Sequence, residues 1–276
     1  MSRLKNYKKG NKTYFQEFIM QNGKYVYIRS WKSEQEYLDA QSAKEKDIVK
    51  LSREYPHLDV MLKQKKRQKR FGTFDIKDAG DFVIRCNELK PNSVDAIITD
   101  PPYPREYLPL YEKLGEVSKF VLKPGGSLVV MIGQSYLPEI LNMIAKSLNY
   151  QWLVSYQTPG GQSAQLWQRK VNTFWKPVIW FVKGVYEGKW IGDVAKSSVN
   201  ANEKQFHQWQ QSESGMLDLV DRFTKRGNIV LDPFMGSGTT GYASVKLGRH
   251  FIGIDIDADI IEIANQRLTE FTRNGK

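Results

Sequence analysis

Short apolar runs alternate with helical stretches along the sequence from Phe71 to the C-terminus. Continuous apolar runs are typical of strands that are buried on both faces of a parallel sheet. We expect strands within 82–84, 96–98, 127–132, 152–155, 178–182, 229–231 and 251–254. Helices are expected at 105–122, 136–148, 213–225, 238–247 and 258–271. This alternation predicts an α/β protein whose parallel sheet is covered by helices on both faces.

The first 70 residues have a different composition. They hold 18 Lys and Arg against 8 Asp and Glu, so they carry +10 of the chain's net charge of +11. Residues 33–70 are predicted to be mostly helical and residues 25–28 to form a short strand. A basic run such as Lys63–Arg70 is often only a solvated helix or linker, but in a polyanion-binding protein it supplies phosphate contacts. We therefore divide the chain into a basic N-terminal extension, 1–70, and an α/β domain, 71–276.

The overall composition narrows the class of protein. A hydrophobic content of 41% suffices for a sizeable core. No apolar run approaches the roughly 20 residues of a membrane span, and the N-terminus lacks the apolar region of a secretory signal. The single cysteine, Cys86, excludes an internal disulfide, and the three histidines show no close ligand spacing. These features predict a cytoplasmic protein with no metal and no membrane partner.

The tetrapeptide Asp100-Pro101-Pro102-Tyr103 directly follows the apolar run 94–99. Two prolines remove two backbone donors and fix φ, so the strand has to end there. The carboxyl end of a strand is where open α/β sheets bind ligands. A carboxylate and a carbonyl can accept both hydrogens of an exocyclic amine, and a ring can stack on a planar base. The motif is short, and helix capping by Asp100 is the structural alternative.

A glycine-rich segment, Asp232–Gly241, follows the expected strand at 229–231 and opens a helix. Its three glycines have the G-x-G-x-x-G spacing, and Asp255 lies 19 residues after Gly236 at the end of the next strand. This arrangement is typical of a loop that approaches an adenosine-type cofactor, with the acid accepting from ribose hydroxyls. Only 35 residues follow Gly241, which is too few for the remaining strands of a dinucleotide-binding fold. No Gly-Lys-Ser/Thr follows the glycines, which excludes a P-loop.

With both motifs in this order, the chain resembles the S-adenosylmethionine-dependent DNA amino-methyltransferases of the adenine-N6/cytosine-N4 family. The tetrapeptide precedes Asp-Pro-Phe-x-Gly-Ser-Gly-Thr-Thr, which is the permuted order called the beta class. The resemblance covers 71–276 and includes Leu122–Gly126 and Trp175–Pro177. It implies a Rossmann-like S-adenosylmethionine methyltransferase fold with a circularly permuted motif order.

The resemblance also implies roles for individual residues. The catalytic set would orient the amine of a base flipped out of the duplex and stack on that base; it comprises Asp100, Pro101, Pro102 and Tyr103. The set that would bind S-adenosylmethionine comprises Asp81, Phe82, Asp232, Phe234, Gly236, Ser237, Gly238, Thr239 and Asp255. Asp81 is equally well explained as a turn residue, and Asp255, taken without the glycine loop, as a surface acid at a strand end.

Two regions are candidates for contacts with double-stranded DNA. The first is the basic extension, for which we hypothesise a DNA-clamping arm, and the second is a target-recognition region at about 159–212. Glutamine can be bidentate to adenine and arginine to guanine, although both segments are also explained as surface loops. The residues expected to bind DNA are Lys65, Lys66, Arg67, Lys69, Arg70, Gln165, Arg169 and Lys170. The family's His-Pro-Thr-Gln-Lys-Pro-like segment lacks its Lys and Pro at His207, so a packing or DNA-facing role is as well supported there as cofactor contact.

Asp at the first position of the tetrapeptide resembles adenine-N6 enzymes more than cytosine-N4 enzymes, and adenine is the expected target. Cytosine-N4 methylation is the first alternative. Methylation of RNA or of a protein glutamine, and a non-catalytic DNA-binding protein with this fold, are further alternatives. A homodimer and a cognate restriction endonuclease stay open as partners.

Overall fold

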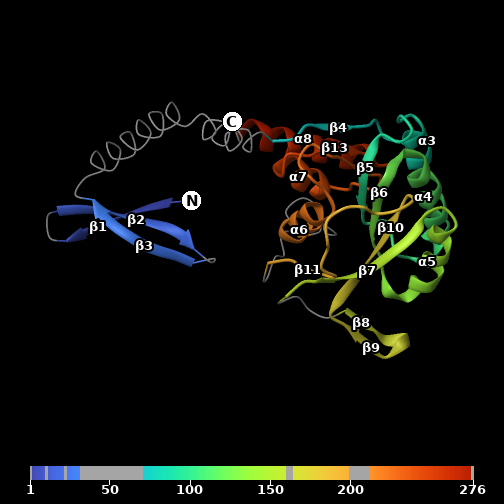
Figure 1. The fold of residues 1–276 in the computed structure, drawn as a ribbon, viewed down its shortest axis with the longest axis horizontal. Helices are drawn as coiled ribbons and strands as arrows, with labels where there is room; N and C mark the ends of the chain where they lie inside the picture. The colour runs from blue at the N-terminus through green and yellow to red at the C-terminus, as the bar shows by residue number, and fades with distance from the viewer. Residues whose placement is uncertain are drawn as a thin grey trace. The chain divides into compact units, whose positions relative to one another are not determined.

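The computed structural model describes residues 2–9, 12–21, 24–31, 71–159, 164–198 and 212–274, with only the backbone in the first three ranges (Figure 1). Contacts between Cα atoms divide the chain into two compact units, Met1–Lys69 and Arg70–Lys276. Each unit is described by itself.

The first unit contains a three-stranded antiparallel sheet, β1-β2-β3. Its strands are β1 (Ser2–Lys9), β2 (Lys12–Gln21) and β3 (Lys24–Trp31). The short strand expected at 25–28 lies within β3, and the other two strands were not expected. The helical prediction for 33–70 falls outside the described residues, as do the basic residues Lys65, Lys66, Arg67, Lys69 and Arg70.

The second unit is built on an eight-stranded sheet of order β11-β7-β10-β6-β5-β12-β13-β4. Its strands are β4 (Phe74–Ile76), β5 (Val94–Thr99), β6 (Leu122–Met131), β7 (Asn149–Gln157), β10 (Trp175–Val182), β11 (Val194–Lys196), β12 (Ile229–Asp232) and β13 (His250–Gly253). All neighbouring strands are parallel except β10, which runs antiparallel to both β6 and β7. A separate hairpin, β8 (Ala164–Leu166) and β9 (Val171–Thr173), precedes β10.

Helices cover both faces of this sheet (Figure 1). They are α3 (Phe82–Asn87), α4 (Leu108–Val121), α5 (Leu137–Ala145), α6 (Glu213–Phe223), α7 (Thr239–Lys246) and α8 (Ala258–Asn274). Successive residues of β5 show the two layers, because side chains alternate across a strand. Ile97 packs in the core of α3, α4 and α5, whereas Ile98 packs in the core of α6 and α7. Within the described part of the chain, no helix combines the length and apolar character that a bilayer crossing requires.

The Rossmann-like α/β architecture is confirmed, and three local expectations change. Residues 82–84 form the start of helix α3, not the expected strand. Asp81 caps this helix, and Phe82 and Cys86 are buried while Ile84 is 63% exposed, which is the one-sided pattern of a helix at i and i+4. The edge strands β4 and β11 were not expected, because each has only three residues. The sheet is not wholly parallel, since β10 is reversed.

Candidate active site

Both sequence motifs lie at the carboxyl edge of the large sheet. The Asp100 tetrapeptide follows β5, the glycine loop follows β12, and Asp255 comes two residues after β13. Strand β12 pairs with β5 on one side and β13 on the other, so the three segments are neighbours at that edge. The structure thus brings together residues that are more than 130 positions apart, at the place where open α/β sheets bind ligands.

The tetrapeptide is held by tyrosine hydroxyls. Tyr103 donates a hydrogen bond to the Asp100 carboxylate, and the hydroxyl of Tyr111 on α4 donates to the Pro102 carbonyl at 3.2 Å. Pro101 is buried and Pro102 is exposed. Tyr111 is 1% exposed, and its contact with the tetrapeptide was not expected from the sequence. In the sequence it is one polar ring among the apolar residues of the buried face of α4.

The Tyr103 ring has close neighbours from two other strand ends. A Cβ added at Gly133, just after β6, would lie in ordinary van der Waals contact with Cβ and Cγ of Tyr103, at 3.6 Å, so this strand end packs beside the ring. The Nζ of Lys176, near the start of β10, lies 5.6 Å from the centroid of the same ring. Burial, and then the Asp100 carboxylate, raise the pKa of the Tyr103 hydroxyl well above its ordinary value. Tyr103 therefore stays a neutral hydrogen-bond donor at physiological pH.

The pKa values of two further tyrosine hydroxyls are raised in part by the charge of Asp100. Burial and the Asp100 carboxylate both raise the pKa of Tyr111. Burial raises the pKa of Tyr156, at the end of β7, to about 12, with Asp100 adding to the effect. Because all three tyrosines stay neutral, Asp100 is the group in this cluster that can accept hydrogen bonds as a carboxylate.

Asp232 links the two motifs through its buried carboxylate. Its Oδ1 accepts a hydrogen bond from the Thr99 hydroxyl at 2.6 Å and another from the Phe234 backbone N–H at 3.1 Å. Thr99 immediately precedes Asp100, so this contact ties the end of β5 to the end of β12. Burial raises the pKa of Asp232 to about 6, although the hydrogen bonds from Thr99, Thr240 and Phe234 oppose the rise.

The glycine loop has the backbone that its sequence predicts. Gly236 and Gly238 have φ of 50° and 76°, a region that glycine adopts without steric cost. The Gly236 N–H donates to Oδ2 of Asp255 at 2.9 Å, and the Gly80 N–H donates to the Asp255 backbone carbonyl at 3.1 Å. Asp255 therefore organises the loop on one side and the segment before α3 on the other.

The expected cofactor residues of α3 reach the same place. The rings of Phe82 and Phe234 lie 4.7 Å apart between centroids. Asp81 accepts a hydrogen bond from the Val83 N–H at 2.8 Å and so caps α3. The structure thus places Asp81 in a capping role beside the cluster, and its contact with a cofactor stays a prediction.

Arg267, a buried arginine whose role the sequence did not suggest, forms hydrogen bonds to the glycine loop. Nη1 of Arg267 on α8 donates to the Ser237 carbonyl at 2.9 Å and to the Thr239 hydroxyl at 3.2 Å. Its Nη2 forms an ion pair with Glu213 on α6 at 2.7 Å. Arg267 therefore connects two helices to the part of the loop that the sequence assigns to the cofactor.

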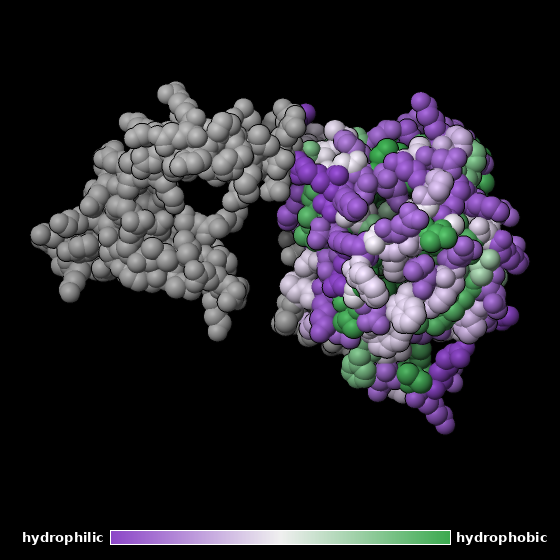
Figure 2. Space-filling view, viewed as in Figure 1, coloured by the Kyte–Doolittle hydropathy of each residue, from purple (hydrophilic) through white to green (hydrophobic). Residues whose placement is uncertain are grey.

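The described residues of the expected recognition region include the β8–β9 hairpin. Gln165, Arg169 and Lys170 are exposed on it, and their contact with DNA stays a prediction. Nη2 of Arg169 donates to the Ser135 carbonyl at 2.9 Å, which anchors the hairpin to the end of β6. On the face drawn in Figure 2 the surface of this unit is mostly hydrophilic, with small hydrophobic patches that include some near the hairpin. Residues 160–163 and 199–211, with His207, lie outside the described part.

Comparisons with known proteins identify the family of this chain. A family profile described as DNA methylase matches residues 184–266. The type II methyltransferase M.HpaI of Haemophilus parainfluenzae is 30% identical over an alignment of 219 positions, gaps included, that covers 65% of this chain and 69% of that protein. M2.DpnII of Streptococcus pneumoniae is 26% identical over 66% of this chain and 85% of its own length.

Solved structures show the same fold. The crystal structure of the M1.HpyAVI–SAM complex has a TM-score of 0.58 at 25% identity, covering 71% of this chain and 99% of that one. The cytosine-N4-specific PvuII DNA methyltransferase has a TM-score of 0.61 at 18% identity, covering 75% of this chain and 95% of that one. With the tetrapeptide preceding the glycine loop, as in the beta class, the chain belongs to the adenine-N6/cytosine-N4 family of DNA amino-methyltransferases.

Proposed function

We propose that this chain methylates the exocyclic N6 of adenine in DNA. The observation that carries the proposal is the junction of the two motifs, in which Asp232 joins Thr99 of the tetrapeptide strand to Phe234 of the glycine loop. DNA is the substrate and S-adenosylmethionine is the cofactor. An amine-binding carboxylate and a cofactor loop on adjacent strand ends are what a direct transfer between the two ligands requires.

The residues around the glycine loop fit S-adenosylmethionine. A Cβ added at Gly236 would meet nothing within 4 Å, so the loop backbone there is open to a ligand. The Asp255 carboxylate can accept from ribose hydroxyls. Phe82 and Phe234 offer an aromatic wall for the adenine ring. When bound, the cofactor supplies an electrophilic methyl group on a sulfonium.

Asp100 and the Pro101 carbonyl would hold the amine of the target base. The nitrogen lone pair of such an amine is delocalised into the ring, so orientation and electrostatic stabilisation at Asp100 are the available means of activation. The Asp100 carboxylate accepts from the Tyr103 hydroxyl in this structure. The incoming amine would replace that donor and release the Tyr103 ring to stack on the base. Extruding the base from the duplex costs roughly a few kcal/mol.

The choice of adenine rests on Asp100 at the first position of the tetrapeptide. A similar curated protein, at 25% identity, is the DNA adenine methyltransferase YhdJ of Escherichia coli, which supports the same choice. Cytosine-N4 is the competing outcome of the experiment.

The test incubates the protein with labelled S-adenosylmethionine and DNA and identifies the product nucleoside by mass spectrometry. N6-methyladenine is expected, and N4-methylcytosine would replace the adenine assignment. Asp100→Ala should abolish transfer while the dissociation constant for S-adenosylmethionine stays unchanged. Asp75→Ala, at an exposed acid on the edge strand β4, is the matched control and should remain active. Full activity in Asp100→Ala would contradict the assigned role.

We further propose that residues 1–70 act as a DNA-clamping arm and that residues 159–212 form the target-recognition region. The support for the arm is its charge of +10, because neutralised phosphates release counterions. Replacing Lys65, Lys66 and Arg67 by glutamine should flatten the dependence of log Kd on log salt by roughly 0.9 for each lost phosphate contact. An unchanged slope would remove the arm from the DNA interface. A homodimer and a companion restriction endonuclease stay predictions from the resemblance.

A further inference from the structure

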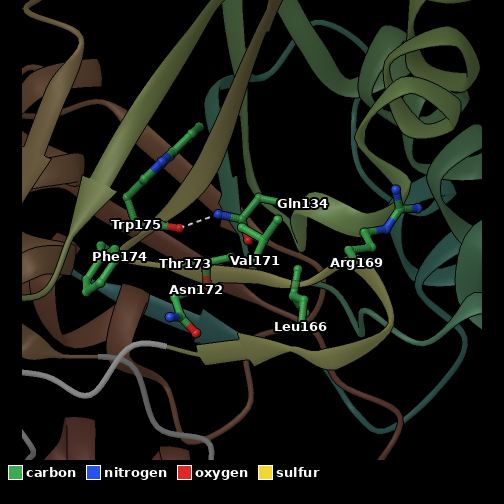
Figure 3. A pocket seen from close by; sticks show the side chains of 8 residues that line it. All are labelled: Gln134, Leu166, Arg169, Val171, Asn172, Thr173, Phe174 and Trp175. Atoms are coloured by element: carbon green, nitrogen blue, oxygen red, sulfur yellow. Dashed lines mark hydrogen bonds between the residues drawn. The ribbon is translucent and has the colours of Figure 1, made fainter.

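A cavity of about 310 Å³ lies at the base of the β8–β9 hairpin (Figure 3). Its lining comes from three places: Gln134 after β6, Arg169 and Asn172 of the hairpin, and Phe174 and Trp175 at the start of β10. The Nε2 of Gln134 donates to the Trp175 carbonyl at 2.6 Å, the contact drawn as a dashed line in Figure 3. The cavity is therefore framed by elements that are hydrogen-bonded to each other.

The cavity adjoins the tetrapeptide but is separate from it. Gly133 and Lys176 both lie beside the Tyr103 ring. The cavity is lined by their chain neighbours, Gln134 after Gly133 and Trp175 before Lys176. None of the tetrapeptide residues is among those that line the cavity. A base stacked on Tyr103 would thus occupy one site. The cavity offers a second site beside it, lined by the chain neighbours of Gly133 and Lys176.

The lining has the chemistry of a nucleotide site. Phe174 is 72% exposed, so its ring is open to a planar ligand, whereas the Trp175 side chain points away from Phe174 and Asn172 (Figure 3). Aromatic rings that face a nucleic-acid strand stack on its bases. The Asn172 amide is exposed and can pair with the edge of a base. Arg169 adds a positive charge at the rim, suited to a phosphate.

The size and support of the cavity favour one nucleotide over a larger ligand. About 310 Å³ is at the small end of the range for ligand pockets, which is roughly 300–1,000 Å³. The hairpin that carries Asn172 is fixed by its β8–β9 pairing and by the bond from Arg169 to the Ser135 carbonyl. Its position relative to Tyr103 is therefore set before any ligand arrives.

We infer that this cavity binds the nucleotide adjacent to the target base, with Phe174 stacking on it and Asn172 contacting its edge. The inference rests on the proposed DNA methylation, because it places a neighbouring nucleotide of the same DNA. The cavity then contributes to the recognised sequence at one defined position.

The first experiment expresses the protein in cells and maps the methylated sequence by direct sequencing of modified DNA. Asn172→Ala should relax the sequence at one position next to the methylated base and leave the other positions unchanged. Phe174→Ala should lower kcat/KM for DNA roughly tenfold by loss of stacking. Phe174→Tyr should restore it, since the ring is kept. Phe120→Ala, at an exposed aromatic of α4 that lies outside residues 159–212 and does not line the cavity, is the matched control.

The second experiment leaves the protein unchanged and removes the base of the DNA nucleotide that the cavity is proposed to bind. An oligonucleotide with an abasic residue next to the target base should be methylated roughly tenfold more slowly by the wild-type protein. The same substitution should have little further effect on Phe174→Ala, because both changes remove one stacking contact. This measurement stays decisive if a variant fails to fold.

The two proposals fail in different ways. If the wild-type protein methylates DNA but tolerates the abasic residue and keeps its sequence in Asn172→Ala, the cavity assignment is wrong and the proposed function stands. If the wild-type protein binds S-adenosylmethionine but methylates no DNA, the proposed function fails and the cavity assignment falls with it.

Discussion

The buried carboxyl of Asp232 should make the stability of this protein depend on pH in a calculable way. Asp232 is 2% exposed, and burial raises the pKa of its carboxyl from 3.8 to about 6 in the folded chain. The folded protein then binds this proton more tightly than the unfolded chain does. The difference corresponds to about 3 kcal/mol, at about 1.4 kcal/mol per pKa unit. The wild-type protein loses this stability as the pH rises through the interval between the two pKa values.

Asp232→Asn removes the ionisation and keeps an oxygen that can accept from the Thr99 hydroxyl and the Phe234 N–H. The unfolding free energy of the variant minus that of the wild type should therefore increase by about 2 kcal/mol between pH 4.5 and 7.5. Contributions from groups that do not interact with Asp232 cancel in this difference; the Asp100 carboxylate is coupled to it and adds to the rise of its pKa. The measurement is urea denaturation of both proteins across that pH range, with Asp259→Asn at an exposed position of α8 as the control.

A constant difference between Asp232→Asn and the wild type at every pH would refute this reasoning. It would mean that the hydrogen bonds from Thr99, Thr240 and Phe234 offset the effect of burial and leave the pKa of the carboxyl at its ordinary value. A difference that shrinks as the pH rises would go further and reverse the assigned sign. A parallel assay of methyl transfer would show whether the link between the two strand ends also supports catalysis.

Two other substitutions test the surroundings of Asp100. Tyr111→Phe deletes the donor to the Pro102 carbonyl, so kcat should fall about 3- to 10-fold with KM for S-adenosylmethionine unchanged, as steady-state kinetics would show; an unaltered kcat would assign Tyr111 to packing alone. Gly215→Ala would place a Cβ 1.9 Å from the Tyr156 hydroxyl in a buried contact, and the overpacking should cost about 1–3 kcal/mol in urea denaturation. Gly192→Ala, whose Cβ meets nothing closer than 3.5 Å, should change stability far less, and equal losses in the two variants would argue against the overpacking.

Much of the large sheet follows from the sequence because most of its strands are apolar and buried on both faces. Residues 96–98, 178–182 and 229–231 were expected as strands and lie in β5, β10 and β12. The strand prediction for 82–84 was wrong because Phe, Val and Ile all favour strands. The helix is recognised from the burial of Phe82 and Cys86 on one side, which depends on tertiary contacts. The reversal of β10 also leaves no local trace, since a strand has the same side-chain period in either direction.

The site divides in the same way between local and distant information. The tetrapeptide and the glycine loop are contiguous motifs, and their backbone demands are visible in the prolines and glycines. Tyr111, Tyr156 and Arg267 reach the site from separate helices and strands, so their roles depend on packing that no local pattern records. That Gly236 and Asp255 lie at one site could be predicted, because the 19 residues between them correspond to one helix and one strand that return the chain to the same edge of the sheet. In the structure a hydrogen bond joins the two residues.

The reversed strand β10 attaches both ends of the segment that we propose for DNA recognition to the same edge of the sheet. Strand β7 ends at Gln157 and β10 begins at Trp175, and because they are antiparallel the chain leaves and re-enters the sheet at the same edge. Residues 158–174 can therefore change in length and content without shifting either strand or the junction at Asp232. If the proposed roles hold, relatives with this plan can differ in the DNA sequence that they modify while Asp100 keeps the same surroundings. Exchange of this one segment between relatives then becomes a direct test of what sets the sequence preference.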